Sequence, residues 1–137
     1  MSKKNLICLD VGTRRIGVAL ADSSIRIAIP FTTVEVDDEN HSEIDEINKI
    51  IVNEKIDIMV VGLPRNLSGE ETAQSVYTKK FAENFKYSVK KLEFQDESLT
   101  SVQAENLLKS YKKPYSKGDI DMNAAAIILS DYLEENF

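Results

Sequence analysis

Hydrophobic residues in the first quarter of the chain fall into three short segments separated by turn-like residues. Residues 5–10 predict a short buried strand, and residues 16–22, where large and small side chains alternate, predict a second strand. Residues 25–35 predict a third strand that bends near Pro30. Because so few residues separate the three segments, we expect an antiparallel meander.

Further along the chain, helical and strand patterns alternate. In order, the predicted elements are a helix over 42–54, a strand over 56–61, a helix over 70–85, a strand over 88–94, and helices over 101–110 and 120–134. We expect Ser42 to cap the first of these helices, and Ser68 with Glu71 to form a capping box on the second. Meander strands followed by βα units predict an α/β protein with a mixed five-stranded sheet and helices on both faces.

Composition narrows the class of protein. The 137 residues, 42% of them hydrophobic, contain no repeat or linker-like stretch, so we expect a single domain over 1–137. The single cysteine, Cys8, and the single histidine, His41, exclude a disulfide framework and metal sites built mainly from these residue types. No apolar run approaches the ~20 residues that cross a membrane, and the N-terminus has no export signal. We therefore expect a cytoplasmic protein with no membrane partner.

The net charge of −6 argues against a plainly basic nucleic-acid binder. Ten of the 23 acidic residues, however, gather in residues 35–46 and 131–137, which contain no Lys or Arg. The rest of the chain is therefore slightly basic, and a local basic surface is allowed. Lysines of 109–117 interleave with Tyr111 and Tyr115, which suits contact with nucleic acid or, equally, a solvated loop.

Carboxylates stand where predicted strands and helices end or begin. Asp10 ends the first strand, Asp96 and Glu97 follow the last strand, and Asp119 and Asp121 open the last helix. Each could simply end a strand or cap a helix, and Asp119 fits the cap better than Asp121 does. In open α/β sheets, however, ligands bind beyond the carboxyl ends of the strands. Three carboxylates without a His or Cys cluster suit Mg²⁺ or Mn²⁺.

Two loops offer groups that could contact phosphate. The loop over 62–69 contains Arg65 and Asn66 and leads into a predicted helix, whose first backbone N–H groups could bind an anion. Thr13, Arg14 and Arg15 lie in the turn directly after the first strand and could also meet a phosphate. Both loops could also be ordinary connections between elements. We regard Thr13, Arg14, Arg65 and Asn66 as candidate contacts with a substrate backbone.

Four segments of the chain together resemble one known family. They are DVGTRRIGVALAD (10–22), VGLPRNLSG (61–69), QDESLTSVQAE (95–105) and KGDIDMNAAAIIL (117–129). In this order and spacing they resemble the YqgF type of bacterial pre-16S rRNA nucleases, once described as Holliday junction resolvases. The glycine-rich opening alone also resembles the phosphate loop of actin-like ATPases. The chain departs from the family pattern at Ser98, where the residue is commonly Arg.

The resemblance, which spans essentially the whole chain, implies a ribonuclease H-like fold and a metal-dependent endonuclease. It implies that Asp10, Glu97 and Asp121 bind one or two Mg²⁺ or Mn²⁺ ions, which would activate water for attack on a phosphodiester. The implied substrate is structured RNA, namely the 5′ end of the 16S rRNA precursor during ribosome maturation in the cytoplasm. The ribosomal particle itself is a possible partner.

Two other functions remain open at this point. A Holliday junction resolvase acting on four-way DNA would have to be a two-fold dimer, because it cuts two strands symmetrically; the sequence leaves both a monomer and a homodimer open. A non-catalytic RNA- or ribosome-binding factor is slightly favoured by the acidic charge and by Ser98. An ATPase is a weaker candidate, because the chain is too short for the second domain that closes over nucleotide in such enzymes.

Overall fold

The computed structural model describes residues 3–64, 70–97 and 100–137. Its sheet has five strands in the spatial order β3-β2-β1-β4-β5. The strands are β1 (Asn5–Val11), β2 (Arg15–Asp22), β3 (Ile29–Glu35), β4 (Ile58–Pro64) and β5 (Lys91–Glu97). Strands β1, β2 and β3 form an antiparallel meander, whereas β1, β4 and β5 run parallel to one another. The predicted mixed sheet is therefore confirmed, although β3 begins four residues later than the third predicted strand.

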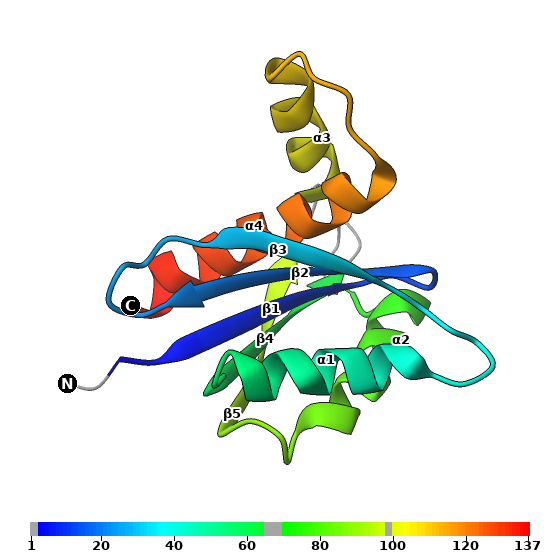
Figure 1. The fold of residues 1–137 in the computed structure, drawn as a ribbon, viewed down its shortest axis with the longest axis vertical. Helices are drawn as coiled ribbons and strands as arrows, with labels where there is room; N and C mark the ends of the chain where they lie inside the picture. Colours follow the sequence, from blue (N-terminus) through cyan, green and yellow to red (C-terminus); the bar gives the residue numbers. More distant parts are fainter. Residues whose placement is uncertain (1–2, 65–69, 98–99) are drawn as a thin grey trace.

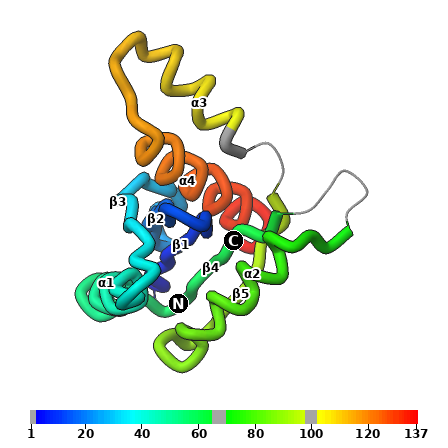
Figure 2. Tube along the Cα trace, turned by 90° about the vertical axis from the view of Figure 1, so that its right-hand side faces the viewer, coloured from blue at the N-terminus to red at the C-terminus, as the bar shows by residue number. Residues whose placement is uncertain are grey.

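Helices cover both faces of the sheet. They are α1 (Ser42–Asn53), α2 (Ala73–Ala82) with a following 3₁₀ turn η1 (Glu83–Phe85), α3 (Thr100–Ser110) and α4 (Lys117–Asn136). Figures 1 and 2 show α1 and α2 on one side of the sheet, α4 on the other, and α3 projecting away from the sheet. Within the described residues, no helix combines the length and apolar character needed to cross a membrane.

Two helix starts differ from the predictions. The residue that precedes α1 is His41, in a left-handed conformation (φ 54°), and Ser42 is the first helical residue rather than the cap. For α2 the cap is Thr72, whose hydroxyl accepts a hydrogen bond from the backbone N–H of Ser75 (3.1 Å). The Ser75 hydroxyl in turn accepts one from the Thr72 backbone N–H (2.8 Å). A serine thus replaces the Glu or Gln of the usual capping box, while the predicted cap Ser68 lies outside the described residues.

Alternation along β1 assigns its side chains to two cores. Ile7 and Leu9 belong to the larger core, which lies beneath α1 and α2. Leu6 and Cys8 belong to the core beneath α4, where Cys8 is fully buried as a small core residue. Because successive side chains of a strand point to opposite faces, Asp10 continues the row of Leu6 and Cys8. Its carboxylate is therefore carried to the side of the sheet that α4 covers.

Candidate active site

Asp10 lies between two strands that each have a glycine beside it. In the antiparallel pairing of β1 with β2, Asp10 stands opposite Gly17. In the parallel pairing of β1 with β4, Leu9 stands opposite Val61, so Gly62 is the next residue of β4. Because glycine has no side chain, Gly17 and Gly62 leave space on both sides of the Asp10 carboxylate. Other segments of the fold can approach Asp10 through this space.

Gly17 brings the start of α4 onto the sheet. A Cβ at Gly17 would lie 2.0 Å from the backbone oxygen of Asp121, so no residue with a side chain permits this approach. Ser116 and Asp119 cap the helix: the Ser116 hydroxyl accepts from the Asp119 N–H (3.2 Å), and the Asp119 carboxylate accepts from the Ser116 N–H (2.9 Å). Asp119 therefore belongs to the cap as predicted, although Ser116 is the N-cap residue, and Asp121 is left to approach the sheet.

Gly62 gives space to the third carboxylate. A Cβ at Gly62 would lie 3.1 Å from Oε2 of Glu97 and 2.7 Å from Cδ1 of Ile128, a residue of the core beneath α4. The carboxylate of Glu97, at the end of β5, therefore reaches back over β4 on the α4 side of the sheet. Asp96, whose side chain points to the opposite face by alternation, is exposed.

The three carboxylates influence one another electrostatically. Burial, followed by the nearby charges of Glu97 and Asp121, raises the pKa of Asp10 to about 8. Burial also raises the pKa of the Cys8 thiol, with additional contributions from Asp10 and Glu97. The fold therefore disfavours ionisation of Asp10, a cost that a bound cation would offset.

One positive group already contacts the cluster. Nε of Arg15, the first residue of β2, donates a hydrogen bond to Oδ2 of Asp121 at 2.6 Å. The two side chains are 32% and 21% exposed, so the ion pair lies at the rim of the site. The sequence placed Arg15 in a turn among residues that could meet a phosphate, but gave no sign of this contact, which joins positions 106 residues apart.

The donor types match a hard divalent cation, because all three candidate ligands are carboxylates. Among the described residues, however, no three His, Cys, Asp or Glu side chains are grouped closely enough to hold a metal ion as they stand. Asp10, Glu97 and Asp121 thus share one end of the sheet and one electrostatic environment, and their assignment as metal ligands stays a prediction.

The candidate substrate contacts are only partly described. Thr13 and Arg14 are exposed in the turn between β1 and β2 that follows Asp10. Arg65 and Asn66 lie outside the described residues and remain predictions.

No sequence pattern indicated a contact between α2 and β1. The side-chain amide of Gln74 donates a hydrogen bond to the backbone oxygen of Val11 (2.9 Å) and connects α2 to the end of β1. A lone glutamine on a helix carries no sequence signal for such a role.

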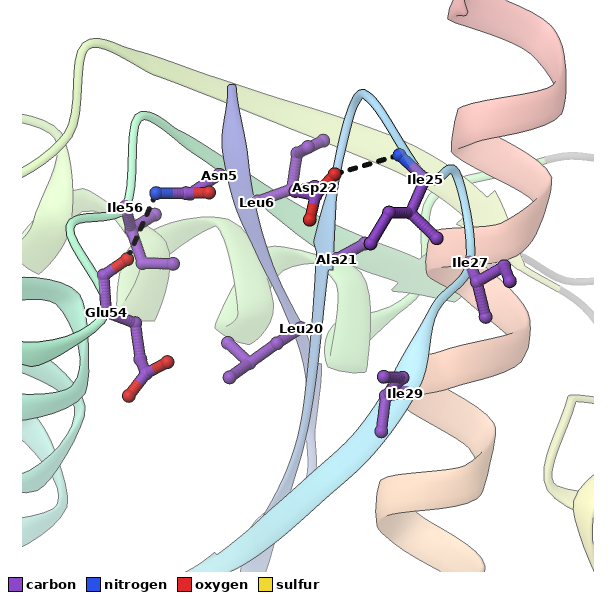
Figure 3. Close-up of a pocket in the computed structure, with 10 residues that line it drawn as sticks. All are labelled: Asn5, Leu6, Leu20, Ala21, Asp22, Ile25, Ile27, Ile29, Glu54 and Ile56. Atoms are coloured by element: carbon purple, nitrogen blue, oxygen red, sulfur yellow. Dashed lines mark hydrogen bonds between the residues drawn. The ribbon is translucent and has the colours of Figure 1, made fainter. Parts of the chain in front are cut away.

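Two pockets differ in chemistry. A pocket of about 530 Å³ beside Asp121 is lined mainly by residues from α3, α4 and the segment between them, and Arg15 and Lys117 supply its positive charges. At the opposite end of the sheet, a pocket of about 200 Å³ is lined mostly by aliphatic side chains, among them Ile25, Ile27 and Ile29 (Figure 3). Of these two pockets, the first is lined by one of the three carboxylates, Asp121, so it is the one relevant to their chemistry.

Comparisons with known proteins agree with this architecture. A family model described as "RuvX: Holliday junction resolvase" matches residues 4–135. A "Putative pre-16S rRNA nuclease" of Synechocystis sp. is 41% identical over 138 residues, covering 98% of this chain and 90% of the relative. One of the same name from Chloroflexus aurantiacus is 38% identical over 137 residues, covering 98% of this chain and 89% of the relative.

Solved structures show the same fold. A structure of T. thermophilus RuvC in complex with a Holliday junction substrate superposes with a TM-score of 0.57 at 13% identity, covering 96% of this chain and 94% of that one. At this identity the likeness establishes the fold alone, and it confirms the ribonuclease H-like architecture. The match over almost all of the sequence goes further: this chain belongs to the RuvX family of nucleases, hydrolases that act on ester bonds.

Proposed function

We propose that this chain is a metal-dependent endonuclease that cuts phosphodiesters in structured RNA and matures the 5′ end of the 16S rRNA precursor in the cytoplasm. Asp10, Glu97 and Asp121 are the proposed ligands of Mg²⁺ or Mn²⁺. Thr13 and Arg14 are the proposed contacts with the substrate backbone, together with Arg65 and Asn66. The names of the relatives support this choice of substrate.

The observation that carries the proposal is the position of Asp10. Its carboxylate lies between Gly17 and Gly62, and these glycines admit Asp121 on one side and Glu97 on the other. A fold that needed only stability would not gather three carboxylates where burial and mutual repulsion disfavour them. The arrangement is understandable when a cation offsets the charge.

The protein's own part in the reaction is to bind and orient. Divalent ions at such a site supply activation of water and stabilisation of the leaving oxygen. Asp10 sits on the rigid central strand β1, which fixes its position relative to Glu97 on β5. The exposed Arg14 can approach a phosphate without burying its charge, and so it can align the RNA backbone beside the carboxylates.

The test compares the parent protein with Asp10→Asn and with Asp57→Asn, a matched change at the far end of the sheet. Each protein is incubated with Mn²⁺ and end-labelled 16S precursor RNA that carries its 5′ extension, and the fragments are read on a sequencing gel. Asp10→Asn should slow specific cutting about a thousandfold, because a catalytic ion contributes several kcal/mol and each ~1.4 kcal/mol is about tenfold in rate. Asp57→Asn should cut like the parent, and full activity in Asp10→Asn would contradict the assignment.

The second candidate is cleavage of four-way DNA junctions. It is favoured by the description of the family model. Symmetric cutting needs two active sites, so this activity requires a two-fold dimer. Light scattering on the purified protein, together with cleavage of a synthetic junction, tests it, and a strictly monomeric protein would count against it. Metal-independent RNA binding without cleavage of either substrate would instead indicate a binding factor.

A further inference from the structure

The ion pair between Arg15 and Asp121 engages the carboxylate of one of the three proposed metal ligands. Arg15 Nε donates to Oδ2 of Asp121 at 2.6 Å, a short, charge-assisted contact. The backbone of Arg15 is fixed separately, because its carbonyl accepts from the Gly12 N–H (2.9 Å) and it pairs with Glu35 of β3. The side chain can therefore move without disturbing the strand.

A metal ion and the guanidinium compete for Asp121. Both are cations, and placing a divalent ion against the carboxylate brings two positive charges within a few ångströms of each other in a partly buried setting, where their repulsion is weakly screened. The stronger charge is that of the metal ion. Its binding to Asp121 would therefore favour release of the Arg15 side chain.

The pocket of about 530 Å³ next to Asp121 is where the Arg15 side chain, once released, could bind another anionic group. Arg15 itself lines this pocket, and Lys117 is a second cation there. Glu105, which also lines it, accepts a hydrogen bond from the hydroxyl of Tyr115 (2.9 Å), and this contact orients the Glu105 carboxylate. With metal bound to Asp121, the pocket would hold two cationic side chains against the single carboxylate of Glu105, and this excess of positive charge suits an anionic group such as a phosphodiester.

We propose that Arg15 exchanges partners: it binds Asp121 in the metal-free protein and, once metal occupies that carboxylate, binds a substrate phosphate in the pocket between β2, α3 and α4. This inference rests on the proposed metal-dependent action on nucleic acid and adds a link between its two binding events. Metal would strengthen nucleic-acid binding through Arg15, and nucleic acid would strengthen metal binding by the same factor.

The first test measures this coupling without relying on cleavage. The dissociation constant of a fluorescent RNA hairpin is measured by anisotropy in EDTA and in Ca²⁺, for the parent, Arg15→Gln and Arg14→Gln. Ca²⁺ should strengthen binding to the parent about tenfold more than binding to Arg15→Gln, which is within the usual range of coupling between two sites. Arg14→Gln removes the same charge from the exposed neighbour, so it should weaken binding in both conditions and keep the coupling.

The second test measures metal binding alone. Free Mn²⁺ is followed by electron paramagnetic resonance during titration of the parent and of Arg15→Gln. Loss of the competing cation should tighten Mn²⁺ binding about threefold to tenfold, as expected for one nearby charge. Mn²⁺ binding that is unchanged or weaker in Arg15→Gln, or coupling equal to the parent's, would overturn the exchange.

These results are separable from the fate of the proposed nuclease. If the parent cuts RNA but Arg15→Gln shows full coupling, the exchange is wrong and the nuclease stands. If coupling is lost in Arg15→Gln while no RNA is cut, the exchange stands and the proposed reaction is wrong.

Discussion

Two aspartates at opposite ends of the parallel strands show how one residue type can serve two purposes. Asp57, just before β4, accepts hydrogen bonds from the backbone N–H of Asn5 (2.9 Å) and from Nζ of Lys90 (3.3 Å). These contacts, the Asn5 N–H first, lower the pKa of Asp57. Asp10, near the other end of β1, has a pKa raised to about 8 by burial and by two neighbouring carboxylates.

Hydrogen bonds to the charged carboxylate of Asp57 stabilise the fold, whereas the charged carboxylate of Asp10 destabilises it. Asp57 also accepts backbone hydrogen bonds at its carbonyl from Lys90 and Lys91 (2.9 and 3.2 Å), so it joins the starts of β1, β4 and β5. Around Asp10, by contrast, strand glycines leave room for more negative charge. Carboxyl groups with strongly raised pKa values are characteristic of functional sites.

The largest effect should come from crowding the Asp10 end. Gly17→Ala places a methyl group against the backbone oxygen and nitrogen at the start of α4, which cannot yield as a side chain could. We expect the free energy of unfolding to fall by about 3 kcal/mol, the upper part of the range for overpacking. Urea denaturation measures the loss, and RNA cleavage should fall too because Asp121 is displaced.

Gly118→Ala is the matched control for this change. A Cβ at Gly118 meets Thr33 and Ser116 only at 3.5–3.6 Å, which is ordinary contact, and alanine favours a helix. This variant should be as stable as the parent or up to about 1 kcal/mol more stable. Equal stability of Gly17→Ala and the parent would show that α4 does not sit on this glycine.

The next effect should have the opposite sign. Asp10→Asn keeps the shape of the side chain and removes a carboxyl that the fold holds at a raised pKa. In EDTA at pH 7 we expect the variant to be about 2 kcal/mol more stable than the parent, since a raised carboxyl pKa represents lost stability at neutral pH. Thermal denaturation measures the difference in stability. If Asp10→Asn proved less stable than the parent, the inference that the Asp10 carboxyl destabilises the fold while that of Asp57 stabilises it would be wrong.

The smallest effect concerns the partnered aspartate. Asp57→Asn should lower the free energy of unfolding by about 1 kcal/mol at pH 7, because hydrogen bonds to a charged acceptor exceed those to a neutral one by about that amount. The folded-state pKa of Asp57 is lowered, so its contribution is complete above about pH 4 and disappears as the pH falls through the folded value. Denaturation curves of parent and variant should therefore converge in acid and separate near neutrality.

Much of the fold was predictable from local patterns. The apolar run over 5–10 and the alternation along 16–22 predicted β1 and β2. The period of a strand then puts Asp10 in line with Leu6 and Cys8. Local patterns could not supply the pairing of Asp10 with Gly17, because register depends on how whole strands align. The role of Gly17 was hidden for the same reason: a glycine within a strand indicates close approach, but not by which segment.

The candidate site was predictable as a set of residue types and less so as an arrangement. Strand ends and a helix start suggested five carboxylates, and the family resemblance implied Asp10, Glu97 and Asp121 among them. The structure brings these three to one face of the sheet. The contact of Arg15 with Asp121 is tertiary, between residues 106 positions apart, so no spacing rule could predict it. The start of α2 was missed because Ser75 takes the place of the expected acidic capping partner.

The order of the elements, with α4 after all five strands, has a consequence for how the protein folds during synthesis. The five strands are complete before α4 leaves the ribosome, and until then the apolar side chains of Leu6, Val60 and their neighbours lack the helix that covers them. Asp121 arrives with that helix. Until α4 packs, the nascent chain exposes an apolar sheet face that favours aggregation, and it lacks the last of the three carboxylates. One folding step therefore covers that face and supplies Asp121.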